Sequence, residues 1–236
     1  MTDKPLHILL TGASRGIGKA IETILIERGA CVVGLSSVDG DLGDRDTPIR
    51  LWNGALEKLD GRIDALINNA GVFEANALDS SDDQWLDNWE RTMAINLTAS
   101  ASFCRHAVLH TQGSRNGGGG GRILNIASRA AHRGDSPAHW HYAASKGGMV
   151  SMTKTIARAY AKESIYAFAI CPGFTMTGMA EDYLQSRGGD KLLADIPLGR
   201  VAMPEEVAAM AAFCVFDAPP SMTGAVLDVN GASYVR

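Results

Sequence analysis

The feature that most constrains this chain is a regular alternation of short apolar runs with longer segments of helical periodicity. Residues 6–11 form an apolar run of strand length, and Ile17, Ile21 and Leu25 then recur at helical spacing. The alternation continues to a last apolar run at residues 225–229. Strands that alternate with helices form a parallel sheet covered by helices on both faces. The pattern therefore predicts a doubly wound α/β fold.

The expected elements follow from this alternation and from helix start and stop signals. Strands are expected at residues 6–11, 31–35, 63–68, 122–127, 166–171 and 225–229, and helices at 16–28, from 47 onward, from 81 onward, at 96–111, 142–162 and 204–216. Two stretches break the pattern. Residues 114–121 are nearly all glycine and predict a surface loop, and residues 174–197, rich in Met and Gly, predict a mobile lid.

Composition narrows the class of protein. A chain of 236 residues favours one large domain, residues 1–236, over two. The net charge of −4 gives no basic field for nucleic acid or an acidic membrane, and no apolar run approaches the length of a membrane span. The polar start leaves no room for a signal peptide. Four widely spaced cysteines predict buried free thiols, no metal site and a cytoplasmic location.

A glycine-rich turn at residues 11–18, Thr-Gly-Ala-Ser-Arg-Gly-Ile-Gly, stands between the first strand and the first helix. Glycines there let a ligand approach the backbone, and the helix N-terminus offers free N–H groups to a pyrophosphate. The spacing differs from G-x-G-x-x-G, and a purely structural tight turn is the alternative. Residues 68–71, Asn-Asn-Ala-Gly, follow the third strand and are either a ligand contact or a turn.

Two further features point to proton transfer. Tyr142 and Lys146 lie four residues apart, which places them on one helix face. A nearby ammonium favours the phenolate and brings a tyrosine into use as an acid or base, although such pairs are usually surface residues. Ser128 follows the fourth strand, where the carboxyl ends of parallel strands meet at a ligand crevice.

Together these motifs resemble the short-chain dehydrogenase/reductase family, in its single-domain branch. The resemblance covers nearly the whole chain, and further matches are Asn96 within 95–97, Cys-Pro-Gly at 171–173 and the closing segment 223–231. It implies a Rossmann-type fold and hydride transfer between a nicotinamide and a carbonyl or secondary alcohol. The cofactor supplies the chemistry, and the protein supplies orientation and proton transfer.

The resemblance also implies roles for four catalytic residues. Tyr142 matches the general acid/base, and Lys146 matches the residue that binds the nicotinamide ribose and lowers the pKa of the tyrosine. Ser128 matches the group that holds the substrate oxygen. Asn96 matches the residue that bends its helix and holds a relay water.

The same resemblance implies contacts to the dinucleotide. Besides Tyr142 and Lys146, the expected contacts are Gly12, Ser14, Arg15, Gly16, Ile17, Gly18, Ser36, Asp41, Leu42, Asn69, Ala70, Gly71, Pro172, Gly173 and Thr175. Ser36 and Ser37 stand at the end of the second strand, where a carboxylate would bind the 2′-hydroxyl of NAD. Arg15 is either a phosphate ligand or an exposed cation. NADP(H) is therefore favoured, and NAD(H) remains the alternative.

One departure from the family concerns the segment between Leu35 and Ile63. Only 27 residues lie there, where the family fits a helix, a strand and another helix. A parallel crossover alone needs about a dozen residues, so the helix after the second strand is expected to be missing. The strand around 38–42 is then vestigial or irregular, which puts the roles of Asp41 and Leu42 in doubt.

The sequence leaves the substrate open. The leading hypothesis is an NAD(P)-dependent reductase or dehydrogenase, of which a 3-oxoacyl-carrier reductase is one form. The alternative is a dinucleotide-sensing module without chemistry. His132, His139 and His141 are expected to line the substrate mouth rather than bind a metal. Apolar and small residues on the helices that begin near Asn96 and Tyr142, together with an apolar last strand, predict a homotetramer, with a dimer as the alternative.

Overall fold

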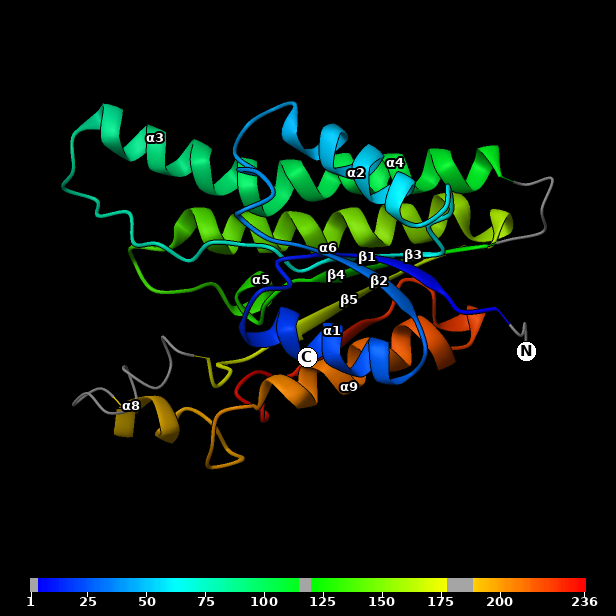
Figure 1. The fold of residues 1–236 in the computed structure, drawn as a ribbon. Helices are drawn as coiled ribbons and strands as arrows, with labels where there is room; N and C mark the ends of the chain where they lie inside the picture. Colours follow the sequence, from blue (N-terminus) through cyan, green and yellow to red (C-terminus); the bar gives the residue numbers. More distant parts are fainter. Residues whose placement is uncertain (1–3, 115–119, 178–188) are drawn as a thin grey trace.

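The structure of the protein, a computed structural model, describes residues 4–114, 120–177 and 189–236 (Figure 1). In this part of the chain one parallel sheet runs in the order β2-β1-β3-β4-β5-β6. The strands are β1 (His7–Thr11), β2 (Cys31–Leu35), β3 (Ala65–Asn68), β4 (Gly121–Ile126), β5 (Ile165–Pro172) and β6 (Val226–Val229). The chain builds outward from β1 to β2 and then restarts on the other side of β1 with β3. This reversal is a topological switch point, where open α/β sheets form their ligand crevice.

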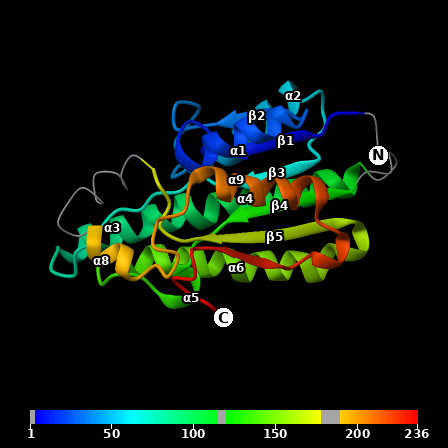
Figure 2. The ribbon, with the colours of Figure 1, turned by 90° about the horizontal axis from the view of Figure 1, so that it is seen from below.

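Helices cover both faces of the sheet, as Figures 1 and 2 show. One layer contains α2 (Thr47–Lys58), α4 (Ala99–Gly113) and α6 (Trp140–Tyr160), and the other contains α1 (Gly16–Glu27) and α9 (Pro204–Ala212). A buried apolar cluster lies in each interface. Phe168 is in the cluster beneath α1 and α9, and Phe103 is in the cluster beneath α2 and α4. The predicted doubly wound α/β fold is confirmed.

The elements that complete the fold are mostly short. They are α3 (Asp82–Met93), the π-turn Ala94–Thr98, α5 (Ala130–Arg133), α8 (Gly189–Ala194), the 3₁₀ turns Ala161–Glu163 and Pro220–Met222, and the π-turn Phe213–Asp217. Ser81 caps α3, because its side chain accepts a hydrogen bond from the Gln84 N–H. The sequence periodicity did not predict α5 or α8, since each is too short to show a helical repeat.

The expected loss of a helix after the second strand is confirmed. Residues 36–46 form only turns and bends, and α2 begins at Thr47 with Pro48 in its first turn. The next strand, β3, pairs with β1, so β2 is left at the edge of the sheet. The irregular course expected around residues 38–42 is what the structure shows.

This open edge corrects the expectation that all four thiols are buried. Cys31, at the start of β2, is exposed, because no described strand covers the outer side of β2. Cys104, Cys171 and Cys214 are buried as expected. The predicted glycine-rich loop lies mostly outside the described residues, at 115–119, and residues 178–188 of the predicted lid lie outside them as well. No described helix combines the length and the apolar character needed to cross a membrane.

Candidate active site

The sequence motifs converge at the carboxyl ends of β1, β3, β4 and β5. In Figure 1, α3 and α8 extend past this edge of the sheet from opposite sides. Gly12 lies just after β1, Asn69 just after β3 and Ser128 shortly after β4, while Pro172 ends β5. The topology therefore brings four separate motifs to the switch point.

The glycine turn after β1 has no space for side chains at two positions. Gly12 has a φ of +71°, and a Cβ there would lie 2.8 Å from the Ala70 Cα. A Cβ at Gly18 would lie 1.9 Å from the Gly12 carbonyl oxygen. Only glycine fits such close backbone approaches. Arg15, the N-cap of α1, makes no side-chain cap, so the first-turn N–H groups are available to an anion.

The turn after β3 is fastened to this glycine turn by four hydrogen bonds. The Thr11 Oγ1 accepts from the N–H groups of Asn69 at 3.0 Å and Ala70 at 3.1 Å. The Asn69 amide donates to the carbonyl oxygens of Thr11 at 3.1 Å and Gly12 at 3.0 Å. The Asn69 side-chain amide is thus engaged in hydrogen bonds to the adjacent turn. These bonds fix the two loops as one unit. Gly16, Ile17 and Gly71 complete this unit, and Ser14 and Arg15 are exposed on it.

Asn96 lies in the π-turn that joins α3 to α4. Its Oδ1 accepts from the Val72 N–H at 2.8 Å, and its Nδ2 donates to the Val72 carbonyl at 3.0 Å and to the Ser145 Oγ at 3.3 Å. A π-turn inserts an extra residue into the helix and redirects its side chains. Here it turns a fully buried amide toward both the loop after β3 and the helix α6.

Lys146 is buried in α6 and reaches the same place. Its Nζ donates to the Ile126 carbonyl at 2.9 Å, and a Cβ on Gly71 would lie 3.5 Å from Nζ and 3.1 Å from the Asn96 Oδ1. Burial disfavours the charged ammonium and lowers the pKa of Lys146 to about 8. The amine therefore remains mostly protonated at neutral pH, because its pKa still lies slightly above neutrality.

Tyr142 and Ser128 lie beside this lysine. Lys146 Nζ is 5.8 Å from the centre of the Tyr142 ring, and the Ser128 side chain is close enough to Tyr142 to act on its pKa. Burial raises the pKa of Tyr142 to about 12, and the Ser128 hydrogen bond offsets this only in part. The sequence led us to expect a lowered pKa. In this structure desolvation of the phenolate is the first cause of the raised pKa, so Tyr142 is a protonated donor.

Phe73, which the sequence did not single out, contacts this tyrosine, and His139 stacks on Phe73. The Phe73 ring meets the edge of the Tyr142 ring with 4.8 Å between centroids. His139 stacks on the other side of Phe73 at 4.0 Å and is held by the Ser136 hydroxyl at 2.6 Å from its Nδ1. His139 was expected at the substrate mouth, and its place next to Phe73 agrees with that. Phe73 gave no periodic signal because it lies in an irregular segment.

The segment after β5 approaches the C-terminal loop. A Cβ on Gly173 would lie 2.8 Å from the Asn230 Cα, and the Gly173 N–H donates to the Val229 carbonyl at 2.9 Å. Thr175 is buried, and its hydroxyl donates to the Gly173 carbonyl at 3.2 Å. Pro172, Gly173 and Thr175 thus form a fixed wall of the crevice.

At the end of β2 the structure contains a carboxylate that the sequence analysis did not expect there. The Asp39 carboxylate accepts from the Ser36 N–H at 2.8 Å and from the Ser36 hydroxyl at 3.1 Å. A carboxylate is therefore present beside Ser36, although neither position 36 nor 37 is acidic. The signal for it was the Ser-x-x-Asp spacing, which is typical of a side-chain-capped turn. Asp41 is occupied elsewhere: its carboxylate accepts from the Gly43 N–H at 2.8 Å and pairs with Arg91 at 3.2 Å. Leu42 packs against a core cluster.

Of the three histidines, His139 and His141 stack on each other at 6.3 Å, and His132 lies apart from them. His141 stacks near Trp89 at 6.4 Å, whereas His132 stacks on Tyr234 at 5.7 Å. Among the described residues, the ligand atoms of His132, Cys171 and Asp228 lie within 4.8 Å of one another. The Asp228 carboxylate already pairs with Arg236 at 3.0 Å, so an arginine provides the positive charge there.

Comparisons with known proteins agree with this geometry. Residues 34–232 match the family model described as enoyl-(acyl carrier protein) reductase. The chain is 32% identical over 244 residues to the 3-oxoacyl-[acyl-carrier-protein] reductase FabG of Vibrio harveyi, with 96% of each chain covered. The Thermotoga maritima enzyme of the same name is also 32% identical, over 96% of this chain and 97% of its own. A crystal structure of the Brucella melitensis 3-ketoacyl-(acyl-carrier-protein) reductase complexed with NADH superimposes with a TM-score of 0.85, at 27% identity and covering 97% and 98% of the two chains.

This chain belongs to the short-chain dehydrogenase/reductase family. It is an NAD(P)-dependent oxidoreductase that acts on a carbonyl group. The fixed glycine turn and the free first turn of α1 fit a nicotinamide dinucleotide, since they offer a backbone surface without side chains. Which dinucleotide binds is a separate question.

The fastening of the two loops gives a first prediction. Thr11→Val keeps the shape but leaves the N–H groups of Asn69 and Ala70 without their acceptor. An unsatisfied buried group costs about 1–3 kcal/mol, so we expect a loss of this size in the free energy of urea unfolding and weaker dinucleotide binding. Thr155→Val is the control, because its exposed hydroxyl bonds only the preceding turn of α6. Equal losses for the two variants would contradict the role given to Thr11.

Proposed function

We propose that this protein reduces the carbonyl group of a 3-oxoacyl compound, with Tyr142 as the proton donor. The observation that carries the proposal is the cluster of Tyr142, Ser128 and Lys146 at the switch point, with Asn96 behind the lysine. Two adjacent hydroxyl groups can hold one oxygen atom, as a carbonyl requires. The 3-oxoacyl class rests on the names of the relatives, which cover nearly the whole chain.

Each residue then has a separate task. Ser128 donates a hydrogen bond to the carbonyl oxygen and orients it. Tyr142, whose pKa burial raises to about 12, is protonated and transfers its proton to that oxygen as negative charge develops there. The Lys146 ammonium stabilises the resulting phenolate and binds the dinucleotide ribose. The dinucleotide, when bound, supplies the hydride. Asn96 positions the loop after β3 and holds the relay water that returns a proton.

A substitution at Tyr142 tests this assignment. Tyr142→Phe removes the donor and keeps the ring in contact with Phe73. We expect the turnover number for acetoacetyl-coenzyme A to fall by a factor of about 10²–10⁴, with dinucleotide affinity nearly unchanged. Tyr160→Phe, at the end of α6, is the control. Retention of most turnover in Tyr142→Phe would refute the assignment. A wild-type protein that binds dinucleotide tightly but turns over no carbonyl would instead favour the sensing module.

We also propose NADP(H) as the preferred cofactor. Arg15 is exposed at the start of α1, next to the first-turn N–H groups, and the Ser36 and Ser37 hydroxyls follow β2. A guanidinium is well suited to a phosphate. The Asp39 carboxylate opposes this preference, but two hydrogen bonds from Ser36 hold it.

The balance between Arg15 and Asp39 can be measured. Arg15→Gln is expected to weaken NADPH binding by about tenfold, the effect of one charged hydrogen bond, and to leave NADH binding nearly unchanged. Asp39→Asn is expected to strengthen NADPH binding, because it removes a repulsive charge. Fluorescence titration of both cofactors gives the affinities, with Lys19→Gln on the same helix as the control. Tighter binding of NADH than NADPH by the wild-type protein would overturn the preference.

We propose that the protein is cytoplasmic and assembles as a homotetramer. We also propose that it has no nucleic-acid or membrane partner. The exposed Leu109 on α4 and the partly exposed edge strand β6 support an interface. The small residue Gly148 on α6 does not support it, since a Cβ there would lie 2.8 Å from the Leu97 side chain of the same chain.

Light scattering at micromolar concentration tests the assembly. We expect a mass four times the 25.0 kDa of one chain. A charged substitution at the exposed Leu109 is expected to lower that mass, because it places a charge in an apolar contact. The exposed Leu78, outside these helices, provides the control position. A mass of one chain for the wild-type protein would contradict the proposal.

A further inference from the structure

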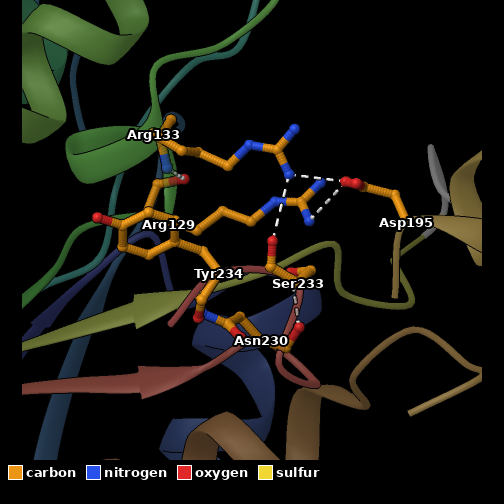
Figure 3. A network of polar contacts seen from close by, with 8 residues as sticks. Arg129, Arg133, Asp195, Asn230, Ser233 and Tyr234 are labelled. Carbon is orange, nitrogen blue, oxygen red and sulfur yellow. Dashed lines mark hydrogen bonds and ion pairs between the residues drawn. The ribbon is translucent and has the colours of Figure 1, made fainter. Parts of the chain in front are cut away.

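Two arginines and one carboxylate form an unequal ion-pair cluster immediately after Ser128 (Figure 3). The Nη1 atoms of Arg129 and Arg133 both contact the same oxygen of Asp195, at 3.5 Å and 2.7 Å respectively. Arg133 also donates to the Ser233 carbonyl at 3.4 Å. Figure 3 shows both guanidinium groups extending from α5 toward Asp195. One carboxylate oxygen therefore serves two cations.

Two other ion pairs in this chain have a different geometry. Arg28 contacts both oxygens of Asp217, at 2.7 Å and 3.1 Å. Arg200 contacts both oxygens of Glu206, at 2.7 Å and 2.9 Å. Each is a one-to-one pair with two parallel hydrogen bonds, the geometry that a guanidinium favours. The pair of Arg129 with Asp195 has neither property.

Arg129 is also the most enclosed of these arginines. Its side chain is 15% exposed, against 37% for Arg133 and 38% for Arg28. Burial, followed by repulsion from Arg133, lowers the pKa of Arg129, while Asp195 and the more distant Asp135 oppose this shift. Burying a guanidinium costs desolvation free energy unless an anion pairs with it closely. The single long contact to Asp195 leaves most of its donors for another anion.

The backbone places Arg129 next to the candidate active site. Arg129 follows Ser128 directly, and its N–H donates to the Pro172 carbonyl at 2.9 Å. Asp195 lies between α8 and the buried Ile196. The guanidinium pair thus lies between the group that holds the substrate oxygen and the segment that includes α8.

We propose that Arg129 and Arg133 form a recognition site for a carboxylate or phosphate group carried by the carbonyl substrate, and that Asp195 occupies this site until the substrate displaces it. The shared oxygen of Asp195 marks where one oxygen of the incoming anion binds. The free donors of Arg129 then bind the second oxygen, which Asp195 does not reach. This inference names a feature of the substrate and rests on the proposed carbonyl reduction.

Matched pairs of substrates test the charge requirement. The probes are 3-oxobutanoate against ethyl 3-oxobutanoate for the carboxylate, and dihydroxyacetone phosphate against dihydroxyacetone for the phosphate. The measured quantity is the ratio of kcat/KM for the anionic probe to that for the neutral one. Arg129→Met keeps the apolar stem and is expected to lower this ratio at least tenfold, since it removes a charge-assisted pair of hydrogen bonds. Arg133→Met, at the more exposed position, is expected to lower it less.

The Asp195→Asn variant separates recognition from support of the fold. If Asp195 competes with the substrate, Asp195→Asn raises the ratio severalfold, mainly through a lower KM for the anionic probe. If Asp195 only fastens α8 to the body of the protein, the same variant lowers turnover of charged and neutral probes alike. Arg28→Met, which breaks a one-to-one pair far from the site, is the control and is expected to leave the ratio unchanged. A ratio that Arg129→Met and Asp195→Asn both leave unchanged overturns the proposal.

A binding measurement keeps this result independent of catalysis. Calorimetric titration with 3-hydroxybutanoate and with its ethyl ester requires no turnover. Stronger binding of the acid to Asp195→Asn than to the wild type, together with its loss in Arg129→Met, supports the anion site even if no carbonyl is reduced. Turnover of neutral carbonyls without any charge preference or anion binding overturns the anion site and leaves the proposed reduction standing.

Discussion

The site depends on the close contact between the turn after β1 and the turn after β3. Gly12 approaches Ala70 so closely that no side chain fits between them, and the Thr11 hydroxyl and the Asn69 amide close the contact. These are the two strands between which the sheet reverses its order. Because the backbones themselves meet here, the crevice has a floor without side chains, as a phosphate group bound by helix N–H groups requires. Ser128 follows the next strand, β4, and Tyr142 and Lys146 lie beside it on α6.

Burial sets the chemistry of those residues. It lowers the pKa of Lys146 to about 8 and raises that of Tyr142 to about 12. Both shifts have desolvation as their first cause, and both disfavour the charged form. A neutral, protonated Tyr142 suits the reduction of a carbonyl, in which the enzyme begins as a proton donor. The opposite direction requires the phenolate, which this environment makes costly.

The sequence predicted the elements and the four motifs well, because apolar periodicity and glycine turns are local signals. It missed one local turn and the contacts that tertiary packing decides. A short turn brings the Asp39 carboxylate, three residues along the chain, beside Ser36. Phe73 contacts Tyr142 from an irregular loop. The lowered tyrosine pKa expected from the helical spacing of Lys146 was wrong for this structure, since spacing alone contains no information on desolvation. The short helix α8 gave no periodic signal.

The shortened connection after β2 shows how the chain adapts to a missing element. Where the family has a helix and a further strand, residues 36–46 form turns that side chains must hold. Asp39 binds Ser36, Asp41 binds Gly43 and pairs with Arg91 of α3, and Leu42 packs on the core. These contacts replace the hydrogen bonds of the lost strand. They also engage the carboxylate of Asp41, so any dinucleotide that binds here meets an adenine end formed from a shorter segment and an open sheet edge. Variation in cofactor preference within such a chain is therefore expected to arise at Arg15 and Asp39 rather than at Asp41.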